Sequence, residues 1–161
     1  MAEWSIAAVL KTVGCNSSVG SNPTPSAKKK NYAKKNKIMD VEQKKKFDIA
    51  INIMQKIKNN NPRIGGSCCL FVLGLKDDFN DIDIIVDTID GIQFDYPIIP
   101  LQHPKRLNRT IKYDIDGIEI DISESLFKEN DTFMKYDIQF ELPNRVIKAR
   151  KLIDDYIKEN Y

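Results

Sequence analysis

The chain has 161 residues, 42% of them hydrophobic and 30% charged, which fits one globular domain whose core needs no disulfide or metal. The net charge of +2 conceals an asymmetry: residues 1–38 carry seven lysines and one acid, whereas residues 39–161 carry 18 basic and 22 acidic residues. The acidic body argues against a domain that coats nucleic acid. The longest apolar stretch, 68–75, is far too short to span a membrane.

Cysteine and histidine are scarce. Cys15, Cys68 and Cys69 form no Cys-x-x-Cys pair, and His103 is the single histidine, so no zinc site is expected. Unpaired thiols are typical of a reducing compartment. Glu3 stands where a signal peptide carries positive charge. We therefore expect a cytoplasmic protein that does not enter a membrane.

The first 38 residues differ from the rest of the chain. Residues 14–37 have no hydrophobic periodicity and are rich in Gly, Ser, Asn, Pro and Lys, which predicts disorder. Residues 1–27 resemble a translated serine tRNA gene, since the Gly-Ser-Asn-Pro of 20–23 is what the T-arm consensus encodes. We expect a leader read through from such a gene, as in a mobile element or phage, and a domain over 39–161. The alternative is a basic tail that contacts RNA or an acidic partner.

The domain is expected to begin with a helix. Asp40 is suited to the N-cap position, with Gln43 as its capping-box partner. Apolar residues then recur at spacings of three and four up to about Lys58. The residues expected to face the core are Phe47, Ala50, Ile51, Met54 and Ile57, with Ile53 on the flank.

Two short apolar segments follow. Residues 63–64 are expected to form a strand that enters Gly65-Gly66-Ser67. The apolar run 68–73 is compatible with a strand or with a buried helix that starts at Ser67 and ends at Gly74, because periodicity does not separate the two in so short a run.

Strands are expected next. Residues 81–87 alternate polar and apolar, and residues 110–115 and 118–123 form a hairpin across Asp116-Gly117. Residues 135–140 are expected to form one more strand. Pro143 opens a last helix. Its inward residues are expected to be Val146, Ala149, Leu152, Ile153 and Tyr156. This order predicts an α/β (α+β) fold with a small mixed sheet flanked by helices.

Two features of the sequence indicate a site for ligand binding or catalysis. Glycines in 65–66 let a ligand approach the backbone, and helix-start N–H groups with the Ser67 hydroxyl suit phosphate oxygens. Asp81 and Asp83 share one face of a strand, and two carboxylates there suit hard divalent cations such as magnesium. Asp121 is a third acid, which converges on the pair if its strand lies beside residues 81–87. Glu119, two residues earlier on the same face, is the alternative third acid.

This order of parts resembles the nucleotidyltransferase superfamily of the DNA polymerase beta type. Thirteen residues separate the Gly-Gly-Ser turn from Asp-Ile-Asp, and a strand with a third acid follows. The segment 65–83 is most similar to AbiE-type toxin nucleotidyltransferases, although Lys76 stands where those enzymes usually have Arg. The resemblance spans residues 42–156.

The resemblance implies a minimal nucleotidyltransferase fold that transfers a nucleoside monophosphate from a nucleoside triphosphate to a hydroxyl or phosphate. It implies two Mg²⁺ ions, a tRNA or protein acceptor, and an antitoxin as partner. The catalytic and metal-binding residues would be Asp81, Asp83 and Asp121, and the nucleotide-binding residues Gly65, Gly66, Ser67 and Lys76.

Other interpretations remain open. The domain could keep the fold and serve as a catalytically inactive nucleotide-binding or interaction module. The basic residues Lys105, Arg106, Arg109 and Lys112 form a solvated stretch in which one or two could bind triphosphate or an RNA acceptor. Cys68 and Cys69 are interpreted as core thiols, because no histidine is placed to activate both.

Overall fold

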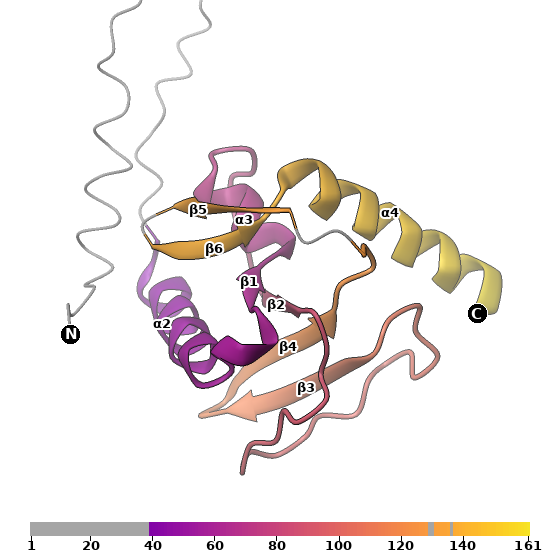
Figure 1. Cartoon of the computed structure of the whole chain (residues 1–161), viewed down its shortest axis with the longest axis horizontal. Coiled ribbons are helices and arrows are strands. Elements are labelled where there is room, and N and C mark those ends of the chain that lie inside the picture. Colours follow the sequence, from indigo (N-terminus) through magenta and orange to yellow (C-terminus); the bar gives the residue numbers. More distant parts are fainter. Residues whose placement is uncertain (1–38, 129–130, 136) are drawn as a thin grey trace, which may run out of the picture.

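The computed structural model describes residues 39–128, 131–135 and 137–161, so the expected leader lies outside the described residues. Within this part, helices and a mixed six-stranded sheet form one α+β unit, which confirms the expected fold class (Figure 1). In chain order the elements are α2 (Val41–Lys56), the short 3₁₀ helix η2 (Lys58–Asn60), β1 (Arg63–Ile64), α3 (Gly66–Val72), β2 (Ile82–Val86), β3 (Thr110–Ile115), β4 (Ile118–Glu124), β5 (Thr132–Lys135), β6 (Ile138–Glu141) and α4 (Pro143–Asn160).

The strands lie in the order β3-β4-β2-β1-β6-β5. Two antiparallel hairpins, β3–β4 and β5–β6, occupy the two ends of the sheet. β2 runs parallel to β4 and antiparallel to β1, and β1 runs parallel to β6. β1 has only two residues, and it joins the two halves of the sheet through the pairs Ile64–Ile84 and Ile64–Phe140.

The two faces of the central strands differ sharply. The even-numbered residues of β2 and the isoleucines of β4 belong to one buried core together with the apolar faces of α2 and α3. The odd-numbered residues point to the opposite face, as the two-residue period of a strand requires. That second face carries Asp83 and Asp121, so the polar face of the sheet is available for a site. The shared core includes Phe47, Ile53, Cys68, Ile82, Ile84, Ile120 and Ile122.

α2 begins as expected, with the capping box formed by Asp40 and Gln43. Its core face is rotated slightly from the expectation, because Ile53 is fully buried and Ile51 only half-buried. The helix ends at Lys56 and continues as the η2 turn, which places Ile57 in the core.

The hairpin turn is confirmed in detail. Asp116 and Gly117 both have positive φ angles, 54° and 81°, as the two central residues of a type I′ turn require. The ambiguous apolar run after Gly65 is a helix, α3, and the buried strand considered as its alternative is excluded.

Two expectations near the end of the chain were wrong. Residues 135–140 are not one strand: β5 ends at Lys135, β6 begins at Ile138, and Asp137 between them has a φ of 59°. Leu152 does not face inward but is 39% exposed, because α4 packs through Val146 and its later turns leave the sheet (Figure 1).

None of the described helices combines the length and apolar character needed to cross a membrane.

Candidate functional site

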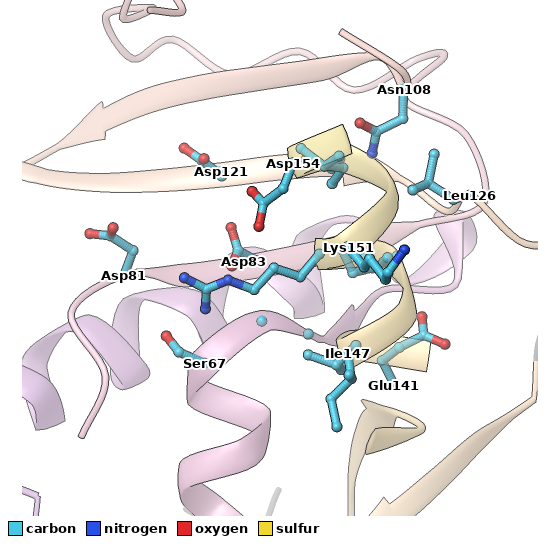
Figure 2. A pocket seen from close by; sticks show the side chains of 18 of the residues that line it. Ser67, Asp81, Asp83, Asn108, Asp121, Leu126, Glu141, Ile147, Lys151 and Asp154 are labelled. Atoms are coloured by element: carbon cyan, nitrogen blue, oxygen red, sulfur yellow. The ribbon is translucent and has the colours of Figure 1, made fainter. Parts of the chain in front are cut away.

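One cleft of about 900 Å³ lies on the polar face of β2 and β4. The first turn of α3 and one side of α4 form its other walls (Figure 2). The structure brings together in this cleft all the residues expected to bind metal or nucleotide in the nucleotidyltransferase interpretation: Gly65, Gly66, Ser67, Lys76, Asp81, Asp83 and Asp121.

A row of charged residues crosses three neighbouring strands at the floor of the cleft. Asp83 on β2 lies directly opposite Asp121 on the parallel strand β4, and Asp121 lies directly opposite Lys112 on β3. Directly paired residues share a face, at a strand spacing of about 5 Å. The condition for convergence of the acids, that the two strands be neighbours, is therefore met for Asp83 and Asp121.

The other two acids are placed differently. Asp81 precedes β2 and is exposed, yet it lines the cleft beside Asp83 (Figure 2). Glu119 pairs with Asp114, has a side chain that is 55% exposed, and is not among the residues that line the cleft. The geometry therefore favours Asp121 over Glu119 as the third acid.

The glycine turn lies against the same carboxylate. The Gly65 N–H donates to the Asp83 carbonyl at 2.9 Å. Gly66 has a φ of +58°, and a Cβ atom at this position would lie 2.0 Å from Asp83 Oδ2. Glycine is needed at position 66 both for the left-handed backbone and for the space that the carboxylate occupies. The row of charges thus ends at the start of α3, where the first N–H groups of a helix have no acceptor within it.

Burial and mutual repulsion change the acidity of the pair. Burial, followed by the charges of Asp121 and Asp81, raises the pKa of Asp83 to about 6. Burial also raises the pKa of Asp121, although Lys112 and Arg106 act in the opposite direction. Carboxylates that repel one another in a concave site are poorly explained by packing and are typical of functional sites.

We expect Asp83→Asn to stabilise the metal-free protein at neutral pH. Since the pKa of Asp83 is raised from 3.8 to about 6, the folded state binds the proton more tightly, and the parent loses stability as the pH rises through this window. The asparagine variant escapes this loss, which is about 3 kcal/mol for a shift of about two pKa units, so its melting temperature should exceed the parent's by several degrees at pH 7.5.

The melting difference should shrink as the pH falls toward 4. The control is Asp116→Asn, the same chemical change at an exposed turn, which should alter the melting temperature little at either pH. A lower melting temperature of Asp83→Asn at pH 7.5 would contradict the repulsion argument.

Several cleft residues lay outside the sequence interpretation. Arg106, predicted to lie in a solvated basic stretch of which one or two residues could bind triphosphate or RNA, lines the cleft and lowers the pKa of both Asp83 and Asp121. On α4, the cleft residues include Ile147, Arg150, Lys151 and Asp154.

The loop that carries Arg106 is tied to the end of α4. The Lys105 N–H donates to the Tyr161 hydroxyl at 2.8 Å, and the rings of His103 and Tyr161 lie 4.6 Å apart. Loop and helix therefore bound the cleft together.

Arg109 does not join the site but binds Asp90 and Glu124. Cys68 and Cys69 are unpaired core thiols, as expected. Burial raises the pKa of both, and that of Cys69 to about 12, which leaves no thiolate nucleophile at neutral pH.

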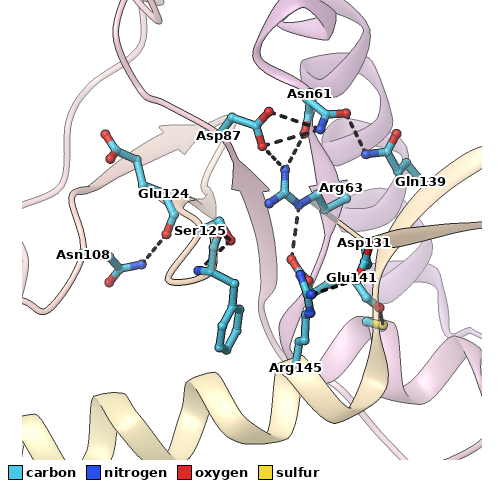
Figure 3. Close-up of polar contacts among 12 residues, drawn as sticks. Asn61, Arg63, Asp87, Asn108, Glu124, Ser125, Asp131, Gln139, Glu141 and Arg145 are labelled. Atoms are coloured by element: carbon cyan, nitrogen blue, oxygen red, sulfur yellow. Dashed lines mark hydrogen bonds and ion pairs between the residues drawn. The ribbon is translucent and has the colours of Figure 1, made fainter. Parts of the chain in front are cut away.

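A buried ion network lies beside the cleft (Figure 3). The fully buried Arg63 guanidinium donates to Glu141 at 3.2 Å, to Asp87 at 2.6 Å and to the Asn61 carbonyl at 3.0 Å. Glu141 also lines the cleft. This network connects β1 to the end of β6 and so fixes the point from which α4 starts.

The donor set suits a hard cation, because carboxylate oxygens are the ligands that magnesium prefers. Asp83 and Asp121 are held by adjacent strands, whereas Asp81 is exposed and Asp121 contacts Lys112. Among the described residues, no three His, Cys, Asp or Glu side chains are already gathered as a metal site. The chemistry of Asp81, Asp83 and Asp121, which all line the cleft, fits a magnesium ion.

No protein-family model, curated protein or solved structure matches this chain. An interpretation of the site therefore rests on its own geometry and on the motif order in the sequence.

Proposed function

We propose that the protein transfers a nucleoside monophosphate from a nucleoside triphosphate to a hydroxyl or phosphate of an acceptor, with magnesium as cofactor. The observation that carries this proposal is the direct pairing of Asp83 with Asp121, with Gly66 against the Asp83 carboxylate. It places two acids and a close-approach backbone within one cleft of about 900 Å³. A pocket of this size suits a nucleotide.

In this proposal the residues of the cleft have separate roles. Asp81, Asp83 and Asp121 would hold magnesium, which supplies charge stabilisation for the attacking and leaving oxygens. Asp121 would also accept the proton of the acceptor hydroxyl. Gly66 and Ser67 would bind the β- and γ-phosphates through backbone N–H groups and the hydroxyl, with Lys76 in the same cleft as an added cation. The protein's contribution is mainly positioning.

The unpaired cysteines bear on the cellular compartment of the protein. We infer a cytoplasmic protein, supported by Cys68 and Cys69, which are unpaired in the described part of the chain.

A nucleotide-binding module without turnover is the second candidate. It is favoured by the contact of Lys112 Nζ with Asp121 Oδ1 at 3.4 Å, since a lysine there offsets the charge that a catalytic ion would use. The acceptor is a tRNA or a protein in the first proposal, and an antitoxin-like partner fits either.

The test is transfer of label from each of four α-labelled nucleoside triphosphates, with magnesium, onto RNA or protein in a lysate. We expect transfer from at least one triphosphate by the parent and a loss of at least about a hundredfold in Asp121→Asn. Asp116→Asn, the same change at the exposed turn of the same hairpin, should retain parent activity.

Triphosphate binding without label transfer would favour the binding module. Equal label transfer by the parent and by Asp121→Asn would show that the paired carboxylates of Asp83 and Asp121 are not the active site.

A further inference from the structure

Lys112 is the one member of the charged row that the proposed function leaves without a role. Its side chain is 22% exposed and lies on β3, directly opposite Asp121. The ammonium group contacts two acids of the same strand: Asp121 Oδ1 at 3.4 Å and Glu119 Oε2 at 3.3 Å.

The two partners of Lys112 differ in their surroundings. The side chain of Asp121 is 18% exposed and lines the cleft, whereas that of Glu119 is 55% exposed and lies outside it. The ammonium group thus bridges a carboxylate inside the site and one outside it. Because Glu119 is a second partner within reach, Lys112 has a carboxylate to pair with when another cation binds Asp121.

We propose that Lys112 is a built-in counter-cation that competes with a divalent metal ion for Asp121, with Glu119 as the position to which it withdraws. This inference rests on the proposed function for the identity of the metal ligands. It assigns Lys112 as a positioning residue that sets how tightly the third carboxylate takes a metal.

The physical basis is charge. The Lys112 ammonium lies 3.4 Å from Asp121 Oδ1 and 3.3 Å from Glu119 Oε2, so it is a positive charge held beside a proposed ligand oxygen. A cation held this close to a ligand oxygen opposes the approach of a second cation and reduces the repulsion that a metal would relieve. Removal of the lysine charge should therefore favour metal binding.

In the experiment, the full chain is titrated with Mn²⁺ alone, and binding is measured by calorimetry or through the paramagnetic signal of the ion. Lys112→Gln should bind Mn²⁺ about tenfold more tightly, since one nearby opposite charge shifts a carboxylate equilibrium by about that factor or more. Lys112→Arg, which retains the charge, should stay within about twofold of the parent.

The matched control is Lys151→Gln, which removes the same charge from another residue that lines the cleft. Lys151 pairs with Asp155 at 3.1 Å and is 79% exposed, so this change should leave Mn²⁺ affinity nearly unchanged. Equal gains in the two glutamine variants would overturn the proposal, because the effect would then be general charge.

Glu119→Gln provides a test of opposite sign. Without the Glu119 carboxylate, Lys112 keeps only its contact with Asp121, so Mn²⁺ affinity should fall. This fall should disappear in a chain that already carries Lys112→Gln. The same fall in both backgrounds contradicts the withdrawal to Glu119.

The outcomes distinguish failure of this inference from failure of the proposed function. A gain of Mn²⁺ affinity in Lys112→Gln without label transfer by the parent supports this inference and rejects the transferase. Label transfer with no change of Mn²⁺ affinity in Lys112→Gln does the reverse. Absence of Mn²⁺ binding in both chains rejects the inference.

Discussion

Gly66→Val is expected to abolish magnesium-dependent nucleotide binding and to reduce the free energy of unfolding by about 1–3 kcal/mol. Two causes combine at this position. A β-branched residue resists the φ of +58°, and its Cβ would lie 2.0 Å from Asp83 Oδ2. The variant therefore displaces a carboxylate as well as the backbone that approaches phosphate. Calorimetric titration with triphosphate and magnesium, alongside urea unfolding, measures both effects.

Three smaller variants separate the causes. Gly74→Ala carries similar backbone strain, at a φ of +74°, but its Cβ meets no atom within 4 Å. Gly66→Ala adds the clash with Asp83, so it should lose binding where Gly74→Ala does not. Ser67→Ala removes only a hydroxyl and should cost about 1 kcal/mol of binding. A Gly66→Val protein that folds and binds nucleotide like the parent contradicts the assignment of the glycine turn.

Arg63→Met is expected to lower the free energy of unfolding by about 3–5 kcal/mol, because it leaves the buried Glu141 carboxylate without its partner. The measurement is urea denaturation of the full chain. Lys151→Met removes an exposed lysine from a surface pair and should change stability by less than about 1 kcal/mol.

The cause of this loss can be tested with a second substitution. Glu141→Leu in the Arg63→Met chain removes the unpaired charge, so it should recover much of the stability. A further loss in the double variant would mean that packing, and not the buried charge, accounts for the effect of Arg63→Met.

Local signals were sufficient for much of the fold. The capping box of Asp40 and Gln43, the Asp116-Gly117 turn and the alternation in β2 each depend on neighbours in the sequence, and the structure agrees with all three. The β5–β6 hairpin was missed because no glycine or proline marks its turn, where Asp137 adopts the positive φ. The apolar spacing of α4 predicts an inward Leu152, but the helix packs through Val146 and Leu152 is exposed.

Less of the candidate site than of the fold could be predicted from the sequence. The parallel register of Asp83 with Asp121 joins segments 38 residues apart, and no local pattern specifies it. Lys112 is different, since a two-residue turn at Asp116-Gly117 fixes the register of the hairpin and pairs Lys112 with Asp121. The sequence therefore contained this contact. The cleft-facing side of α4 did not follow from its apolar pattern, because Val146 is its single buried residue and the other apolar positions are only partly covered in the described part of the chain.

The two-residue strand β1 has a consequence for the rigidity of the cleft. The half of the sheet formed by β6 and β5 is joined to the other half by one backbone register pair, Ile64 with Phe140, and by the side-chain contacts of Arg63 with Glu141 and of Gln139 with Asn61. Arg63, Ile64 and Phe140 are fully buried. Only Leu142 separates β6 from α4, so these buried contacts set the position of one wall of the cleft relative to the carboxylates of β2 and β4.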